Sequence, residues 1–187
     1  MEYTEIIAKS RRSRACKEAL KWAETVTSEE QFWSEITSDW KAWLALRSWC
    51  PVEILAKLAK DSNWYVRCGV AENPKTLVNI LTKLAEDLNL NVRCWVAKNP
   101  NTPVNILAKL AKDSDWYVRY RVAKNPNTPV NILAKLAEDS DWYVRCWVAG
   151  NPNTPVNILA KLAEDSVRDV RYWVAKNPNN NQFNERE

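Results

Sequence analysis

The stretch Asn99-Pro-Asn-Thr-Pro-Val-Asn-Ile-Leu-Ala-Lys-Leu-Ala-Lys-Asp-Ser-Asp-Trp-Tyr-Val-Arg-Tyr-Arg-Val-Ala-Lys124 recurs along the chain every 26 residues. Two columns of equivalent residues mark the register: Pro51, Leu77, Pro103, Pro129 and Pro155, and Arg67, Arg93, Arg119, Arg145 and Arg171. Repetition at a fixed short period is typical of solenoids, in which each repeat buries its apolar surface against its neighbours. The sequence therefore predicts a repeat scaffold, whose ligand depends on a few surface positions.

Each repeat begins with a short predicted helix. Thr102 and Pro103 predict its start, because Thr can accept hydrogen bonds from free helix N–H groups and Pro at the first helical position has no N–H to leave unpaired. Ile106, Leu107 and Leu110 then lie on one face of a 3.6-residue period. We expect that face to be buried and the opposite one to be exposed to water.

A second helix is predicted over Trp116–Lys124. The cluster Asp113–Asp115 ends the first helix and caps the second, because short oxygen-bearing side chains favour turns and helix N-termini. Val118 and Val122, four residues apart, are expected to face the first helix, and Asn125-Pro126 ends the second one. Because no stretch alternates polar and apolar residues and the chain has only two Gly, the fold class is predicted to be all-α.

The domain organisation follows from where the repeat can be recognised. Residues 1–47 are out of register and are predicted to form a helical N-terminal cap, with helices around Glu18–Trp22, after Ser28 and after Ser38-Asp39. Residues 40–45 align with 92–97, so the cap ends in a degenerate half-repeat. About five repeats occupy residues 48–178, and residues 179–187 form a polar C-terminal tail.

Several classes of chemistry lack candidate residues. The chain has no His, no CxxC pair and no glycine-rich phosphate loop, so no metal site, no nucleophile–base pair and no cofactor is expected. Of its five Cys, three occupy one repeat position, where neighbouring repeats would hold them too far apart for a disulfide: Cys68, Cys94 and Cys146. We therefore expect buried free thiols and a non-enzymatic protein without a small-molecule substrate.

Location and charge give weaker indications. No apolar run approaches the length of a membrane span, and the first fifteen residues are too charged for a secretory signal, so a cytoplasmic protein without a membrane partner is expected. The net charge of +4 is smaller than a dedicated DNA-binding domain needs.

The repeat resembles that of the leucine-rich repeat variant family, a group of bacterial α-solenoids. The resemblance covers residues 50–178 and is carried by Asn99-Pro100-Asn101-Thr102-Pro103, by Leu107, Leu110, Ala111 and Asp113, and by Val118-Arg119 with Val122-Ala123-Lys124-Asn125-Pro126. It implies a right-handed superhelix. Some relatives carry an iron–sulfur cluster on a Cys-rich N-terminal segment, but this N-terminus has only Cys16 and Cys50, so the cluster is not expected here.

The repeat also resembles HEAT repeats, in which an Asp between the helices pairs with an Arg six residues later. The same spacing occurs in Asp61–Arg67, Asp87–Arg93, Asp113–Arg119, Asp139–Arg145 and Asp165–Arg171. We interpret these residues as a structural ladder of charge-assisted bonds within each repeat, not as a phosphate-binding stripe. A lysine column, Lys57, Lys83, Lys109, Lys135 and Lys161, is interpreted as a solubilising surface diluted by nearby Glu.

The predicted binding face lies on the second helix of each repeat, at positions equivalent to 117, 120, 121 and 124. Successive helix residues advance by about 100°, which turns these positions away from Val118 and Val122. Exposed Trp, Tyr and Arg are typical of protein-interface hot spots. The candidate partner-binding residues are Trp95, Tyr117, Arg121, Tyr143, Trp147, Asp169 and Trp173.

Other interpretations of these residues stay open at this point. The aromatic side chains could serve only as packing between repeats. Alternatively, the chain could bind nucleic acid, as HEAT-like DNA-repair glycosylases do with Trp and Asp on one surface; here Asp169 and Trp173 resemble that pair. A third reading, consensus-style engineering without any ligand, fits poorly with the irregular cap and the divergent second repeat. A protein partner is the first expectation.

Overall fold

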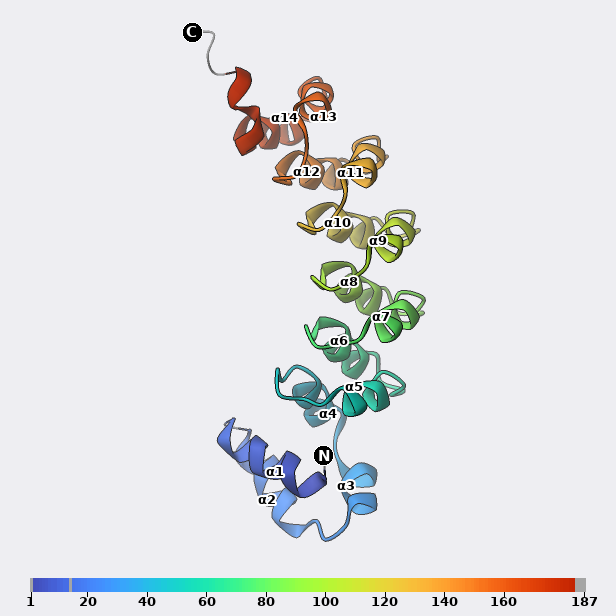
Figure 1. Ribbon diagram of the computed structural model, residues 1–187, viewed down its shortest axis with the longest axis vertical. Coiled ribbons are helices and arrows are strands. Elements are labelled where there is room, and N and C mark those ends of the chain that lie inside the picture. Colours follow the sequence, from blue (N-terminus) through green and yellow to red (C-terminus); the bar gives the residue numbers. More distant parts are fainter. Residues whose placement is uncertain (1, 14, 184–187) are drawn as a thin grey trace. The chain divides into compact units, whose positions relative to one another are not determined.

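The computed structural model describes residues 2–13 and 15–183, so the last four residues of the predicted tail, 184–187, lie outside it. Within this part of the chain there are fourteen α-helices, one 3-10 helix and no strand (Figure 1). The contacts divide the chain into two units, residues 1–70 and 71–187. The predicted all-α solenoid of two-helix repeats is confirmed, whereas the predicted boundary at residues 47/48 stays a prediction.

The first unit packs around an aromatic core. Its helices are α1 (Tyr3–Arg12), α2 (Lys17–Thr25), α3 (Glu29–Glu35), α4 (Ser38–Ala45), α5 (Val52–Leu58) and the larger part of α6 (Trp64–Glu72). Phe32 is fully buried, and its ring centroid lies 5.6 Å from that of Trp22 and 5.9 Å from that of Trp40. The predicted cap at Ser28 is confirmed, since its hydroxyl accepts a hydrogen bond from the Gln31 N–H at 3.1 Å.

The structure differs from the sequence analysis at two helices of this unit. No helix was predicted over residues 3–12, where α1 forms and buries Ile6 and Ile7. Helix α4 is capped by Thr37, whose hydroxyl accepts from the Trp40 N–H at 3.3 Å, and not by Ser38-Asp39, which already belong to the helix.

The second unit is a stack of regular repeats. It contains the seven-residue helices α7 (Val78–Leu84), α9 (Val104–Leu110), α11 (Val130–Leu136) and α13 (Val156–Leu162), which alternate with the nine-residue helices α8 (Leu90–Lys98), α10 (Trp116–Lys124), α12 (Trp142–Gly150) and α14 (Arg168–Lys176), followed by η1 (Pro178–Phe183). In Figure 1 the even-numbered helices form one column and the odd-numbered helices form the other. Consecutive even helices pack directly on one another.

The repeat's apolar pattern folds as the sequence predicts. In the repeat of α9 and α10, Leu107, Val118 and Val122 are fully buried, and Leu110 is 1% exposed. Asp115 caps α10 by accepting a hydrogen bond from the Tyr117 N–H at 2.8 Å. Each repeat thus buries the apolar side of both of its helices, partly within the repeat and partly against the neighbouring repeats.

The predicted role of the repeat's Thr is wrong. Pro103, not Thr102, is the N-cap of α9, and the Thr102 hydroxyl instead donates to the Val96 carbonyl at 2.5 Å. Because Val96 lies in the last turn of α8, its carbonyl does not receive the usual helical hydrogen bond from the N–H four residues later. Thr102 therefore closes the preceding helix, and Thr128 and Thr154 do the same for α10 and α12.

A column of buried Asn ties each repeat to the one before it. The Asn125 amide donates to the Ala97 carbonyl at 2.7 Å and to the Asn99 carbonyl at 3.3 Å, and Asn151 repeats both bonds one step later. Asn125 is only 3% exposed. Since buried carbonyls without a partner are costly, this amide completes the C-terminus of the neighbouring repeat's helix.

The Arg–Asp ladder exists, but its carboxylates come from the next repeat. Arg119 donates to both carboxylate oxygens of Asp139, at 2.7 and 2.9 Å. Within its own repeat it reaches only backbone carbonyls, those of Asp113 at 2.9 Å and Ser114 at 3.1 Å. Arg93 and Arg145 pair with Asp113 and Asp165 in the same way. The predicted pairing of side chains six residues apart is therefore wrong, because the ladder joins repeats instead of closing each one.

The thiols agree with the expectation of burial in four positions out of five. Cys50, Cys68, Cys94 and Cys146 are buried, Cys16 is exposed, and none of the five forms a disulfide. Burial raises the pKa of the Cys94 thiol to about 12 and that of Cys146 to about 11. These two thiols are therefore poor nucleophiles at neutral pH.

The Asn column leads to a first prediction. Replacing Asn125→Ala leaves the Ala97 carbonyl without its donor and removes one of the two donors to the Asn99 carbonyl, so it should lower the free energy of unfolding by about 1–3 kcal/mol. Asn127→Ala is the matched control, because its amide donates to the Pro100 carbonyl at 2.7 Å in an exposed position, where water can replace it. Urea unfolding followed by circular dichroism measures both variants, and equal losses would contradict a special role for the buried amide.

The Arg–Asp ladder leads to a second prediction. Arg145→Ala removes both bonds to Asp165, whose side chain is 8% exposed, and should cost about 2–4 kcal/mol of unfolding free energy. Arg171→Ala is the control, since Arg171 bonds only backbone carbonyls within the described residues and should cost less than about 1 kcal/mol.

The same pair predicts a dependence on pH. The hydrogen bond from Arg145 lowers the pKa of Asp165 below its ordinary value of 3.8 in the folded protein. A carboxylate with a lowered folded pKa stabilises the protein above its unfolded pKa, and this contribution is lost as the pH falls through the folded value. The difference in stability between wild type and Arg145→Ala should therefore shrink as the pH is lowered below about 4. A constant difference would argue against the ion pair.

Candidate interaction surface

The even-numbered helices of the second unit present a continuous aromatic face. We define the aromatic face by Trp95 on α8, Trp116, Tyr117 and Arg121 on α10, Tyr143 and Trp147 on α12, and Trp173 on α14. These residues lie opposite the valines that bury the same helices. Their direction follows from the helical period, as the sequence indicates.

The centre of the aromatic face is a packed cluster that crosses from one repeat to the next. Tyr120 is 6% exposed, so the prediction that this position points outward is wrong. Its ring centroid lies 4.9 Å from Tyr117, 5.3 Å from Tyr143 and 6.0 Å from Trp147. Position 120 and its equivalents lie in the contact between consecutive even helices, where three of the other repeats carry a buried Cys.

Arg121 fixes the tyrosines of this cluster. Its guanidinium carbon lies 4.9 Å from the ring centroid of Tyr120, and its Nη2 donates to the Tyr117 hydroxyl oxygen at 3.0 Å. Hydrogen bonds from Tyr120 and then from Arg121 lower the pKa of Tyr117, whereas burial and the bond to Tyr117 raise the pKa of Tyr120. The Tyr117 oxygen is thus an acceptor on a rigid part of the aromatic face.

Two of the Trp rings are covered by lysines. The Lys98 ammonium lies 4.0 Å above the centroid of Trp95 in the same helix, and the Lys124 ammonium lies 4.0 Å from the centroid of Trp147 in the next repeat. Such cation–π contacts shield one face of each indole. Both rings are half-buried, and a lysine covers one face of each.

Trp173 differs because its neighbour at the lysine position is Gly150. A Cβ added at Gly150 would lie 3.3 Å from Trp173 Cε3, so the absence of a side chain lets the indole settle against α12. There it stacks on Trp147, with centroids 6.1 Å apart and planes inclined by 24°. Trp173 and Trp116 are each 42% exposed, and they are the two most accessible indoles of the aromatic face.

The structure brings five of the seven candidate partner-binding residues together. Tyr117, Arg121, Tyr143, Trp147 and Trp173 form the chain of contacts just given. Trp95 lies one repeat away and contacts no other aromatic ring within the described residues. Asp169 is exposed and forms no ion pair in the described part of the chain. Burial is the main cause that raises the pKa of the Cys146 thiol, and the negative charge of Asp169 is the next.

The sequence analysis placed positions 120 and 124 on this face, but it did not include Tyr120, Lys98 or Lys124 among the candidate partner-binding residues. A signal for the lysines was available, because each follows its Trp or Arg column by three residues, a spacing that makes helix neighbours. The burial of Tyr120 had no such signal, since it depends on how closely the even helices approach.

Part of the positive charge of the lysine and arginine columns is paired with carboxylates. Lys109 and Lys161 form ion pairs with Glu86 and Glu138 of the preceding repeats. Arg93, Arg119 and Arg145 are neutralised by their Asp partners. Among the described residues no group of His, Cys, Asp and Glu could hold a metal ion, and no helix is long and apolar enough to cross a membrane.

Comparison with known proteins supports the fold. No protein-family model and no curated protein matches the chain. Among solved structures, one described as a leucine-rich repeat variant with a novel repetitive structural motif aligns with a TM-score of 0.64 and 23% identity, over 87% of this chain and 66% of that one. The present chain thus spans just under two thirds of that structure. An engineered protein aligns over 98% of both chains, with a TM-score of 0.47 and 18% identity. The chain has the fold of a leucine-rich repeat variant, an α-solenoid of two-helix repeats.

Proposed function

We propose that this protein is a non-enzymatic scaffold that binds another protein through the aromatic face. The single observation that carries the proposal is the stack of the exposed Trp173 on the half-buried Trp147, which Tyr143 continues on the next side of the cluster. Rigid aromatic side chains bury large areas on binding at a small cost in conformational entropy. Trp173, Trp147 and Arg121 would serve as the anchors, and Trp95 and Asp169 as outer contacts.

The environment of the cluster supports a pre-organised binding surface. Tyr117, Tyr120 and Arg121 hold one another through hydrogen bonds and ring contacts, and the ladders below them fix the spacing of the even helices. A partner would therefore pay little for ordering these side chains. The buried free thiols fit a protein of the bacterial cytoplasm, where thiols stay reduced.

Nucleic-acid binding is the alternative for the same surface, and two observations weigh against it. Lys98 and Lys124 lie over the faces of Trp95 and Trp147 on which bases would stack. Three arginines of the ladder, Arg93, Arg119 and Arg145, and two lysines of the column, Lys109 and Lys161, are paired with carboxylates instead of being available to a phosphate backbone. We therefore favour a protein partner.

A pull-down from bacterial lysate tests the proposal. The double variant Trp147→Ala and Trp173→Ala should recover the specific partner about tenfold less well than wild type, since hot-spot residues each contribute about 1–4 kcal/mol. The matched control is Val104→Ala with Val130→Ala, which removes exposed apolar side chains, 52% and 48% accessible, from the odd-numbered helices.

Thermal unfolding of each variant establishes that it is folded before recovery is compared. Equal recovery by wild type and the double Trp variant would remove the aromatic face as the binding surface. A fluorescence-anisotropy titration with a single-stranded oligonucleotide distinguishes the alternative, because binding through phosphates weakens steeply between 50 and 200 mM salt by about 10³-fold or more. Such binding, lost in the Trp variant, would replace the protein partner with nucleic acid.

A further inference from the structure

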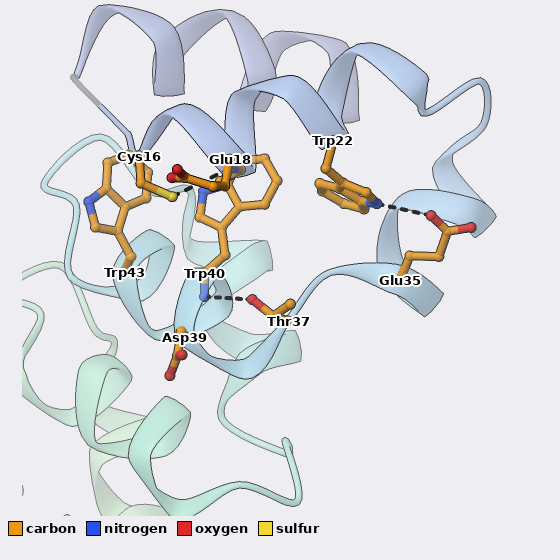
Figure 2. A pocket seen from close by; sticks show the side chains of 9 residues that line it. Cys16, Glu18, Trp22, Glu35, Thr37, Asp39, Trp40 and Trp43 are labelled. Atoms are coloured by element: carbon orange, nitrogen blue, oxygen red, sulfur yellow. Dashed lines mark hydrogen bonds between the residues drawn. The ribbon is translucent and has the colours of Figure 1, made fainter.

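The first unit contains a pocket that the aromatic face does not involve. It has a volume of about 530 Å³ and lies among α2, α4 and the end of α3 (Figure 2). Three indoles, Trp22, Trp40 and Trp43, and three carboxylates, Glu18, Glu35 and Asp39, line it. Pockets of this size commonly hold small molecules or part of a peptide.

The indoles of the pocket are held in place. Trp40 is 7% exposed and packs edge-on against Trp22, with centroids 5.0 Å apart and planes inclined by 81°. The Trp22 Nε1 donates to Glu35 Oε2 at 2.9 Å, as Figure 2 shows. Since this bond fixes both partners, one carboxylate stands beside the aromatic wall in a defined position.

The lining carries only negative charge. No Lys or Arg contributes to it, and within the described residues neither Glu18 nor Asp39 forms an ion pair. Figure 2 places the Glu18 carboxylate beside the Trp40 ring. Indole faces are also electron-rich, so the carboxylates and the rings attract the same class of ligand, a cation.

Other tryptophans of this unit already hold cations of the chain. The Lys57 ammonium lies 3.8 Å from the centroid of Trp33, and the Arg47 guanidinium carbon lies 4.6 Å from that of Trp43. Trp22 and Trp40 have no such partner among the described residues. The pocket thus combines two indoles that have no cation over their faces with carboxylates that form no ion pair among the described residues. Over Trp33 and Trp43, by contrast, the chain places its own Lys57 and Arg47.

We propose that this pocket binds an organic ammonium ion with an apolar body, with the ammonium group against Trp22 and Trp40 and its charge balanced by Glu18 and Glu35. A bare metal ion does not fit, because the carboxylates do not form a metal-binding group. An anion would be repelled, and a neutral apolar molecule would gain nothing from the carboxylates. The ammonium group can belong to a free amine or to a methylated lysine of a peptide.

Titration with phenethyltrimethylammonium chloride tests the pocket, with the indole N–H signals in ¹H–¹⁵N spectra as the readout. Choline and its uncharged isostere 3,3-dimethylbutanol form a matched pair of small probes. We expect the charged probes to shift the Trp22 and Trp40 signals, and the neutral isostere to bind at least about tenfold more weakly. A trimethyllysine peptide with flanking Leu residues tests the protein-borne source; tighter binding of this peptide than of the free amine would assign the ammonium group to a peptide.

The variant Glu18→Gln with Glu35→Gln removes two charges from exposed positions and should weaken binding of phenethyltrimethylammonium about tenfold without unfolding the protein, because the amide oxygen at position 35 can still accept the bond from Trp22 Nε1. Glu53→Gln, an exposed acid on α5 outside the lining, is the control and should leave binding unchanged. Equal binding of choline and the neutral isostere, full affinity in the double variant, or no shift of these indoles with any charged probe would overturn the proposal.

Discussion

The structure depends on polar groups at one repeat's helix ends finding their partners in the next repeat. At the last turn of α8, the Ala97 carbonyl receives its hydrogen bond from Asn125, and the Val96 carbonyl accepts from Thr102 as well as from the C-cap N–H of Asn99. Because Asn125 is buried, this bond cannot be exchanged for water without cost. A repeat of this kind is therefore incomplete alone, and stacking is required by hydrogen bonding as well as by apolar burial.

The Arg–Asp ladder adds direction to this constraint. Arg119 holds the Asp139 carboxylate through two bonds and its own turn through a backbone carbonyl, so one side chain sets the rotation between two repeats. In the first unit, Lys41 stands 26 residues before Arg67 and pairs with Asp61 at 3.1 Å. Helix α4 thus makes the same type of contact with a simpler cation, where the regular repeats begin.

The sequence correctly predicted the helices and the buried residues within each repeat, but it misassigned some of the bonds that join one repeat to the next. Helix α10 and its buried Val118 and Val122 follow from the apolar period. The partner of Arg119 could not be decided in this way, since Asp113 and Asp139 occupy the same column, six residues before and twenty residues after it. In a chain with a period of 26 these two spacings are equivalent, and only the distance between neighbouring turns distinguishes them.

The same limit applies to the candidate sites. The directions of Tyr117 and Arg121 follow from the helical period, but the burial of Tyr120 depends on the approach of α12, which no local pattern encodes. The acidic pocket escaped notice because Trp22, Glu35 and Trp40 belong to three different helices outside the repeat.

The repeat also explains where recognition can vary. Positions equivalent to 118, 119, 122 and 125 are occupied in every regular repeat by residues that burial or a ladder requires. Positions equivalent to 117, 121 and 124 belong to neither group, and their residues vary: Tyr, Asn or Asp at 117, Gly, Trp or Arg at 121, and Glu, Lys or Gly at 124. Gly150 shows how one change acts: by lacking a side chain it opens the space into which Trp173 stacks on Trp147. The surface of the repeats can therefore change at these three positions while the residues that hold the repeats together stay the same.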